Sequence, residues 1–169
     1  MSKDHKNPSH PNAPSCSCCG PGAAISPPDA ASNHRYKAMV LSCIDPRMQK
    51  PVYEYLDEKV GAGNYSHLAI AGAAIAAVAP SFEHWHPTVW DNIAVSLKFH
   101  KFPKVIVVQH RQCGAAGEAY GYVEAGSKEE KRLHRSVARA FRRELHKRHP
   151  QLEVEAVLMD LDGNPKKLL

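Results

Sequence analysis

Two short segments of this chain combine thiol, imidazole, carboxylate and guanidinium side chains. Residues 43–47 read CIDPR and residues 110–114 read HRQCG. Two thiolates and one imidazole are typical ligands of a catalytic zinc ion, because three protein ligands leave the fourth tetrahedral position open to water. We therefore predict that Cys43, His110 and Cys113 bind one Zn²⁺ ion per chain.

The cysteines allow a second interpretation. The chain has five, an odd number, and Cys43 and Cys113 stand beside Asp, Arg and His residues. This setting favours reduced thiolates that serve a metal over a disulfide bond. Free cysteines are also often buried as small apolar side chains, so two structural thiols remain the alternative.

The charged residues of the first segment suggest a role beside the metal. Two thiolates cancel the 2+ charge of zinc, so a bound water needs further help to become hydroxide. Asp45 can accept the hydrogen bond of that hydroxide and orient it toward a substrate. Arg47 can pair with the carboxylate and keep it ionised. Asp45 could instead be the fourth ligand in a closed state.

Apolar runs predict the strands that position both segments. Such runs occupy residues 38–42, 67–71, 104–108 and 154–159, and each is typical of a buried parallel strand. The two chemical segments follow the first and third runs. Ligands bind at the carboxyl ends of parallel strands, so a sheet of order 2-1-3-4 would bring the segments together.

Amphipathic segments predict helices between these strands. One covers residues 48–60 and stops at Gly61. A second begins at a capping box of Thr88 and Asp91 and ends before Pro103. A third begins at a capping box of Ser127 and Glu130 and runs to residue 148. The alternation predicts an α/β fold, a mostly parallel sheet with helices on both faces.

With these two motifs the chain resembles the β-class carbonic anhydrases, whose pattern is CxDxR followed by HxxCG. The resemblance covers roughly residues 36–163. It implies that Cys43, His110 and Cys113 are the zinc ligands and that Asp45 with Arg47 forms a dyad that opens and orients the site. It also implies a homodimer or higher homo-oligomer with active sites at the interface.

The chain departs from the family pattern at three places. Residues 70–74 read IAGAA, where the family usually carries an Arg-Asn-Ala-Gly-like segment. Pro46 stands where Ser is common, and Gln109 stands where Gly commonly precedes the metal histidine. These departures predict a divergent, compact member of the family.

The function expected from the site is reversible hydration of carbon dioxide to bicarbonate by a metal-bound hydroxide. His84 and His86, in the expected loop FEHWHP, are candidates for the proton shuttle, although exposed loop histidines without a role are common. One alternative is a hydrolase of carbon disulfide or carbonyl sulfide that uses the same site. Another is a non-catalytic zinc-binding regulatory protein.

The remaining sequence features predict the domain organisation and the cellular location of the protein. Residues 1–34 are expected to be a disordered tail rich in Pro and His, and residues 35–169 a single zinc-binding domain. Cys16, Cys18 and Cys19 of the tail could hold a soft metal or sense redox state, or be reactive thiols without a role. With no apolar run of about 18 residues, a cytoplasmic protein without membrane contact is expected.

The formal net charge of +5 is concentrated in the basic segment 128–148. The one aromatic residue of this segment, Phe141, belongs to its apolar stripe, so the charges lack the interleaved aromatic residues of a single-strand binding platform and nucleic-acid binding is not expected. A solvated helix face or a subunit contact is the preferred interpretation.

Overall fold

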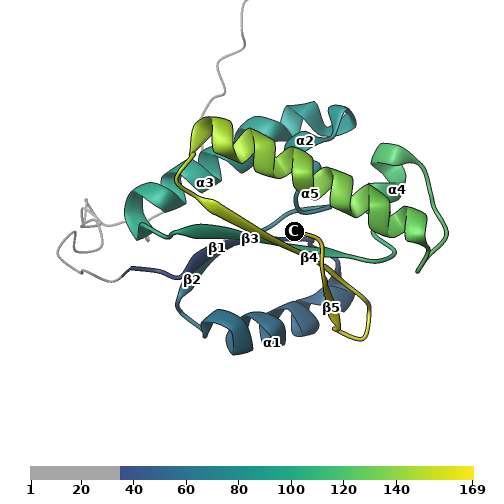
Figure 1. Cartoon of the computed structure of the whole chain (residues 1–169), viewed down its shortest axis with the longest axis horizontal. Coiled ribbons are helices and arrows are strands. Elements are labelled where there is room, and N and C mark those ends of the chain that lie inside the picture. Colours follow the sequence, from purple (N-terminus) through teal and green to yellow (C-terminus); the bar gives the residue numbers. More distant parts are fainter. Residues whose placement is uncertain (1–34) are drawn as a thin grey trace, which may run out of the picture. The chain divides into compact units, whose positions relative to one another are not determined.

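The computed structural model describes residues 35–169, and the predicted tail of residues 1–34 lies outside the described residues. Five strands form one sheet in the order β2-β1-β3-β4-β5 (Figure 1). The strands are β1 (Ala38–Ser42), β2 (Tyr65–Ala69), β3 (Lys104–His110), β4 (Glu153–Met159) and β5 (Pro165–Lys167). The first four pair in parallel and β5 is antiparallel to β4. The predicted α/β class and the order 2-1-3-4 are confirmed, and β5 is an addition at the edge.

Helices cover both faces of the sheet (Figure 1). One face carries α1 (Gln49–Val60), which follows the 3₁₀ turn η1 (Pro46–Met48). On the other side lie α2 (Ile75–Val78), the 3₁₀ segment η2 (Pro80–Trp85), α3 (His86–His100), α4 (Gly114–Tyr120) and α5 (Lys128–Arg148).

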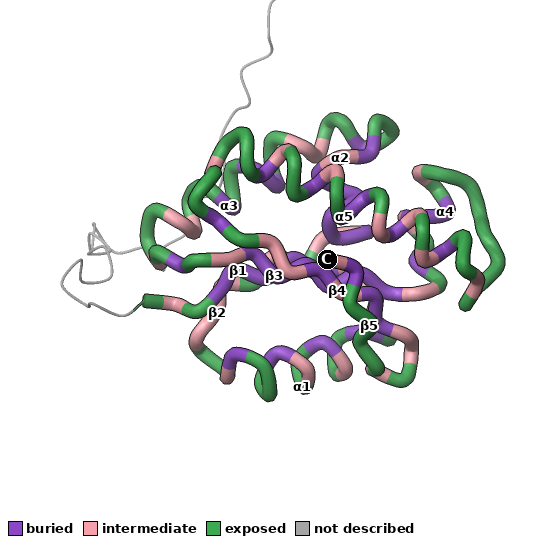
Figure 2. The backbone as a smooth tube through the Cα atoms, viewed as in Figure 1, coloured by how far each residue is buried: buried purple, intermediate pink, exposed green. Residues whose placement is uncertain are grey.

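The central strands are buried on both faces, as their continuous apolar runs predict (Figure 2). Alternate residues of β1 enter different parts of the core. Leu41 packs with residues of α3 and α5, whereas Val40 packs with residues of α1. The end of this strand is thereby held between two apolar layers.

The bounds of α5 agree with the prediction. Ser127 is its N-cap, and the Ser127 Oγ accepts a hydrogen bond from the Glu130 backbone N–H at 3.0 Å. Val137, Phe141 and Leu145 form the buried stripe. The apolar spacing and the cap act together here, which explains why this helix could be predicted residue by residue.

The start of α3 was predicted wrongly. The helix begins at His86 rather than after Thr88, and it has no side-chain cap. Pro87 lies in the first turn of α3. Backbone N–H groups of a first turn have no partner within the helix, so the missing N–H of proline costs no helical hydrogen bond. The segment FEHWHP is accordingly helical, because η2 runs directly into α3. The strand expected at residues 67–71 also lies two residues earlier, at Tyr65–Ala69.

Within residues 35–169, no helix combines the length and the apolar character that crossing a membrane requires.

Candidate metal centre

The sheet brings the two chemical segments together. β1 and β3 are adjacent and parallel, with Ser42 opposite Val108, so both strands end at the same edge of the sheet. Cys43 follows β1, His110 is the last residue of β3, and Cys113 precedes α4. One sulfur or nitrogen atom from each of these three residues lies within 4.8 Å of the others. Zinc bonds of about 2.0 to 2.3 Å hold their ligands about 4 Å apart, so a small adjustment would accommodate the ion.

The imidazole of His110 is oriented as a metal ligand requires. Its Nδ1 lies 2.8 Å from the Arg111 carbonyl oxygen, to which an Nδ1–H donates, and the lone pair therefore resides on Nε2. His110 is buried, and its Nε2 has no hydrogen-bond partner among the described residues. Burying an acceptor without a hydrogen-bond partner costs free energy, and a metal ion bound to Nε2 would remove that cost.

One of the two thiols, that of Cys43, is prepared to lose its proton. The hydrogen bond from the Cys113 thiol, more than that from the Gly72 backbone N–H, lowers the pKa of Cys43 to about 4. The Gly72 N–H donates to the Cys43 Sγ at 3.3 Å. The pKa of Cys113 is raised, because its proton is held by the Cys43 thiolate and because the side chain is buried. A divalent cation would replace this shared proton.

Asp45 and Arg47 form a bidentate ion pair. The Arg47 Nε donates to Asp45 Oδ1 at 3.0 Å, and the Arg47 Nη2 donates to Oδ2 at 2.7 Å. The hydrogen bond from Arg47 lowers the pKa of Asp45 to about 2. Asp45 Oδ2 lies 3.9 Å from His110 Nε2, beside the metal-ligand atoms. Arg47 also donates to the Gln112 carbonyl at 3.2 Å and so joins the two chemical segments.

Glu130 supports the second segment, a role beyond the capping box that its spacing predicts. Its buried carboxylate accepts hydrogen bonds from Arg111 Nη1 at 2.6 Å, Gln112 N–H at 2.7 Å and Gly126 N–H at 2.8 Å. These contacts hold the turn between His110 and Cys113 against the start of α5. The capping spacing was the only sequence signal, and it could not reveal that the carboxylate contacts residues far back in the chain.

Gly72 lies in the segment that departs from the family pattern. Its φ is +76°, and a Cβ there would lie 2.9 Å from the Ala115 Cβ. The sequence does not predict the contact between the Gly72 N–H and the Cys43 sulfur. The contact is made by the backbone, so no side-chain pattern could indicate it.

The other two departures have separate settings. Pro46 begins η1, where a fixed φ suits the first helical position. Gln109 is buried, and both polar atoms of its amide lack a hydrogen-bond partner among residues 35–169.

The two candidate histidines of the proton shuttle differ from each other in their surroundings. His84 is exposed, whereas the His86 Nε2 lies 3.0 Å from the Ala79 carbonyl oxygen. His86 lines a hollow with Trp90 and Arg148. Two cavities adjoin the candidate ligands Cys43 and Cys113, and neither histidine lines them.

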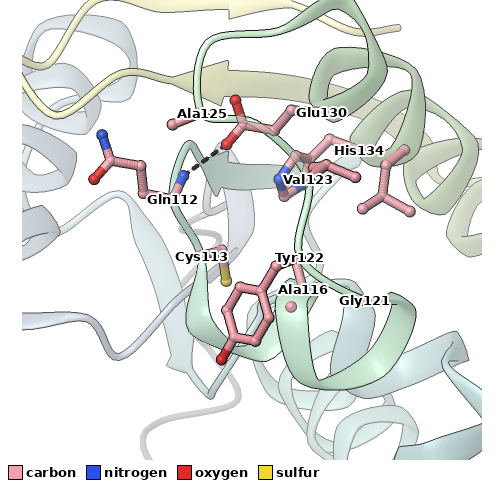
Figure 3. Close-up of a pocket in the computed structure, with 11 residues that line it drawn as sticks. Gln112, Cys113, Ala116, Gly121, Tyr122, Val123, Ala125, Glu130 and His134 are labelled. Atoms are coloured by element: carbon pink, nitrogen blue, oxygen red, sulfur yellow. Dashed lines mark hydrogen bonds between the residues drawn. The ribbon is translucent and has the colours of Figure 1, made fainter.

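These two cavities flank the centre. One, of about 310 Å³, adjoins Cys43 and is lined by Ile44, Tyr53 and His67 among others. The other, of about 260 Å³, adjoins Cys113 and lies between α4, α5 and the loop that joins them (Figure 3).

The chain has relatives of recognisable sequence. An uncharacterized protein of Rickettsia bellii (strain RML369-C) is 27% identical over 126 residues, which cover 74% of this chain and 77% of the relative. An uncharacterized protein of Rickettsia conorii (strain ATCC VR-613 / Malish 7) is 26% identical over 126 residues, covering 74% and 68% of the two chains.

Solved structures share the fold at much lower identity. The β-carbonic anhydrase CafA of Aspergillus fumigatus matches with a TM-score of 0.53 and 12% identity, over 79% of this chain and 76% of the other. A tetrameric β-carbonic anhydrase of Sordaria macrospora matches with a TM-score of 0.51 and 15% identity, over 82% and 83%. Isoform I of the β-carbonic anhydrase of Trichomonas vaginalis matches with a TM-score of 0.51 and 9% identity, over 81% of this chain and 85% of the other.

A family model described as "Putative carbonic anhydrase" matches residues 33–167, which is most of the chain. This match includes both chemical segments and every described strand. The chain therefore belongs to this carbonic anhydrase family, as a divergent member with the β-class fold.

Proposed function

We propose that this protein is a zinc-dependent carbonic anhydrase, which reversibly hydrates carbon dioxide to bicarbonate. Cys43, His110 and Cys113 would hold one zinc ion. The observation that carries the proposal is the buried, unpaired Nε2 of His110 beside two thiols that share a proton. Bound zinc would supply the acidity that makes a coordinated water a nucleophile at neutral pH.

Asp45 is the residue that would orient the reacting water. Its pKa of about 2 keeps it an ionised hydrogen-bond acceptor at physiological pH, and its Oδ2 lies beside the ligand atom of His110. Arg47 occupies both carboxylate oxygens and so limits the directions in which Asp45 can accept a further proton. The same proximity supports a closed state in which Asp45 is the fourth ligand.

Arg111 and Glu130 would keep the imidazole in place. The Arg111 carbonyl accepts the Nδ1–H of His110, and the Arg111 guanidinium pairs with buried Glu130. Contacts of this kind fix the tautomer and the direction of a ligating histidine.

The proposal includes a cytoplasmic homo-oligomer, at least a dimer. Reduced, adjacent thiols suit a reducing compartment. Ile44 and Tyr53, each 55% exposed, lie at the mouth of the Cys43 cavity, where a second copy would cover them. The Sordaria macrospora protein with this fold is described as tetrameric.

Metal analysis combined with stopped-flow carbon dioxide hydration, at neutral and alkaline pH, tests the proposal. We expect one zinc per chain and a catalysed rate, and Cys43→Ser should lose both. One zinc per chain with no hydration at either pH would refute the proposed reaction. Parallel assays with carbonyl sulfide and carbon disulfide would then identify the sulfur hydrolase, and inactivity in all three would leave a zinc-binding protein without this catalysis.

A further inference from the structure

The cavity beside Cys113 contains a polar side chain that the metal centre does not use. His134 lies on α5, one turn after Glu130, and is 1% exposed. It lines the cavity together with Cys113 (Figure 3). Neither ring nitrogen of His134 has a hydrogen-bond partner among the described residues. Buried imidazoles normally find partners, so this one indicates a ligand of the cavity.

The walls around His134 restrict the chemistry of that ligand. Ala116, Leu133 and Val123 contribute apolar surface. Tyr122 covers the space beside Gly117, where a Cβ would lie 2.3 Å from its ring. These walls favour a molecule that is mostly apolar.

The charges at the cavity argue against an ion as the ligand. Glu130 already accepts hydrogen bonds from three N–H donors, so its carboxylate is not free to bind a cation. Its negative charge also disfavours an anion. His134 is itself neutral, because burial lowers its pKa to about 4. A neutral imidazole offers one N–H donor and one acceptor, which suits a neutral ligand with an acceptor atom.

We propose that this cavity is a holding site for a neutral, linear triatomic substrate, carbon dioxide or its sulfur analogues, with the His134 ring donating a hydrogen bond to a terminal atom. The site rests on the proposed function, because Cys113 both lines the cavity and belongs to the candidate metal centre. Asp45 and Arg47 do not line this cavity, so the molecule is held beside the reacting position and not in it.

The role assigned to His134 is binding and not proton transfer. A group whose pKa is about 4 carries almost no proton at neutral pH and is a poor shuttle. As a binding residue, His134 affects substrate capture and leaves the chemical step unchanged.

Infrared spectroscopy of the zinc-loaded full chain tests the holding site. Carbon dioxide, carbonyl sulfide and carbon disulfide are added in turn, and the asymmetric stretch of a protein-bound molecule is resolved from that of the dissolved one. His134→Phe keeps the ring shape without the nitrogens, and Leu133→Phe fills the cavity while His134 stays. His146→Phe makes the same change on α5 at an exposed position outside the cavity and is the control.

We expect at least one of the three molecules to give a bound band that disappears in His134→Phe and Leu133→Phe and persists in His146→Phe. For that substrate, His134→Phe should raise KM roughly two- to tenfold, the worth of one neutral hydrogen bond, with kcat unchanged. His134→Gln, which retains a donor, should recover part of the loss.

Absence of a bound band for all three molecules would overturn the holding site, and so would a band that both cavity variants leave unchanged. A bound band in a protein that does not turn over carbon dioxide would leave the holding site standing while the proposed reaction fails. Catalysed hydration of carbon dioxide without any bound band would overturn the holding site while the proposed reaction stands.

Discussion

Backbone groups orient two of the three candidate metal ligands. The Gly72 N–H contacts the Cys43 sulfur, and the Arg111 carbonyl contacts Nδ1 of His110. Backbone groups are present whatever the side chain, so such contacts survive many substitutions. This explains how the chain can depart from the family pattern at residues 70–74 and still support the Cys43 thiolate.

Asp45→Asn should separate metal binding from turnover. The amide cannot keep the negative charge that Arg47 stabilises, so we expect carbon dioxide hydration to fall by at least about a hundredfold, as for loss of a general acid–base group. Zinc content should stay at one per chain. Asp91→Asn, the same change at an exposed position of α3, is the control. Wild-type turnover by Asp45→Asn would show that our role for Asp45 is wrong.

Glu130→Gln should weaken zinc binding although Glu130 is not a ligand. The amide loses the ion pair with Arg111 and turns a donor toward the N–H groups that the carboxylate now accepts. We expect a tenfold to hundredfold loss of zinc affinity, measured by competition with a chromogenic chelator. Glu129→Gln is a matched control, because Glu129 is exposed and paired only with Arg132 at the surface. Equal affinities for the two variants would contradict the supporting role of Glu130.

At the scale of elements, the two central strands position the candidate ligands Cys43 and His110. β1 and β3 run in parallel at adjacent positions, and both are buried on both faces. Their register cannot slip without exposing apolar residues, which keeps Cys43 and His110 at the same edge. By contrast α4 is short, and Cys113 at its start depends on the turn held by Glu130.

The turn between β2 and α2 should be sensitive to one added methyl group. Gly72→Ala puts a Cβ 2.9 Å from the Ala115 Cβ, next to the contact with Cys43. Gly63→Ala is the matched control, because Gly63 has a similar φ of +77° and no atom within 4 Å of its added Cβ. We expect Gly72→Ala to lower the free energy of unfolding by about 1–3 kcal/mol more than Gly63→Ala, measured by urea denaturation. Equal losses would mean that backbone strain alone matters at both sites.

At the scale of the whole molecule, burial of His134 should make stability depend on pH. The unfolded state binds a proton at the ordinary histidine pKa of 6.5, whereas the folded state binds it only near pH 4. The unfolded state therefore binds more protons between these values, and the free energy of unfolding falls as the pH drops from 6.5 to 4. Two and a half pKa units correspond to roughly 3 kcal/mol.

Thermal and urea unfolding of the wild type and His134→Phe across this pH range measure that contribution. Every other titrating group is common to both chains, so the difference between their curves isolates His134. We expect the variant curve to be flatter below pH 6.5. Parallel curves would show that the pKa of His134 is the same in the folded and unfolded states and would contradict its lowering by burial.

Much of the fold was predictable from local pattern. The apolar runs of β1, β3 and β4 and the capped stripe of α5 are signals that lie within one element. In other elements, tertiary contacts place the ends at residues that differ from the predicted ones. β2 is an edge strand, where burial imposes its register weakly, and it lies two residues earlier than predicted. α3 starts on a proline turn instead of the predicted cap. β5 is a short polar strand that exists because β4 offers it a free edge.

Residue identity in the sequence predicts the candidate ligands, because thiol, imidazole and carboxylate chemistry belongs to the side chains themselves, and apolar periodicity predicts the strands that carry them. Only the tertiary structure decided what surrounds these residues. The Gly72 N–H reaches Cys43 from the turn between β2 and α2, whereas the Glu130 carboxylate and the His134 imidazole reach the surroundings of Cys113 from α5. Their roles arise from contacts across the fold, for which spacing along the chain carries no signal.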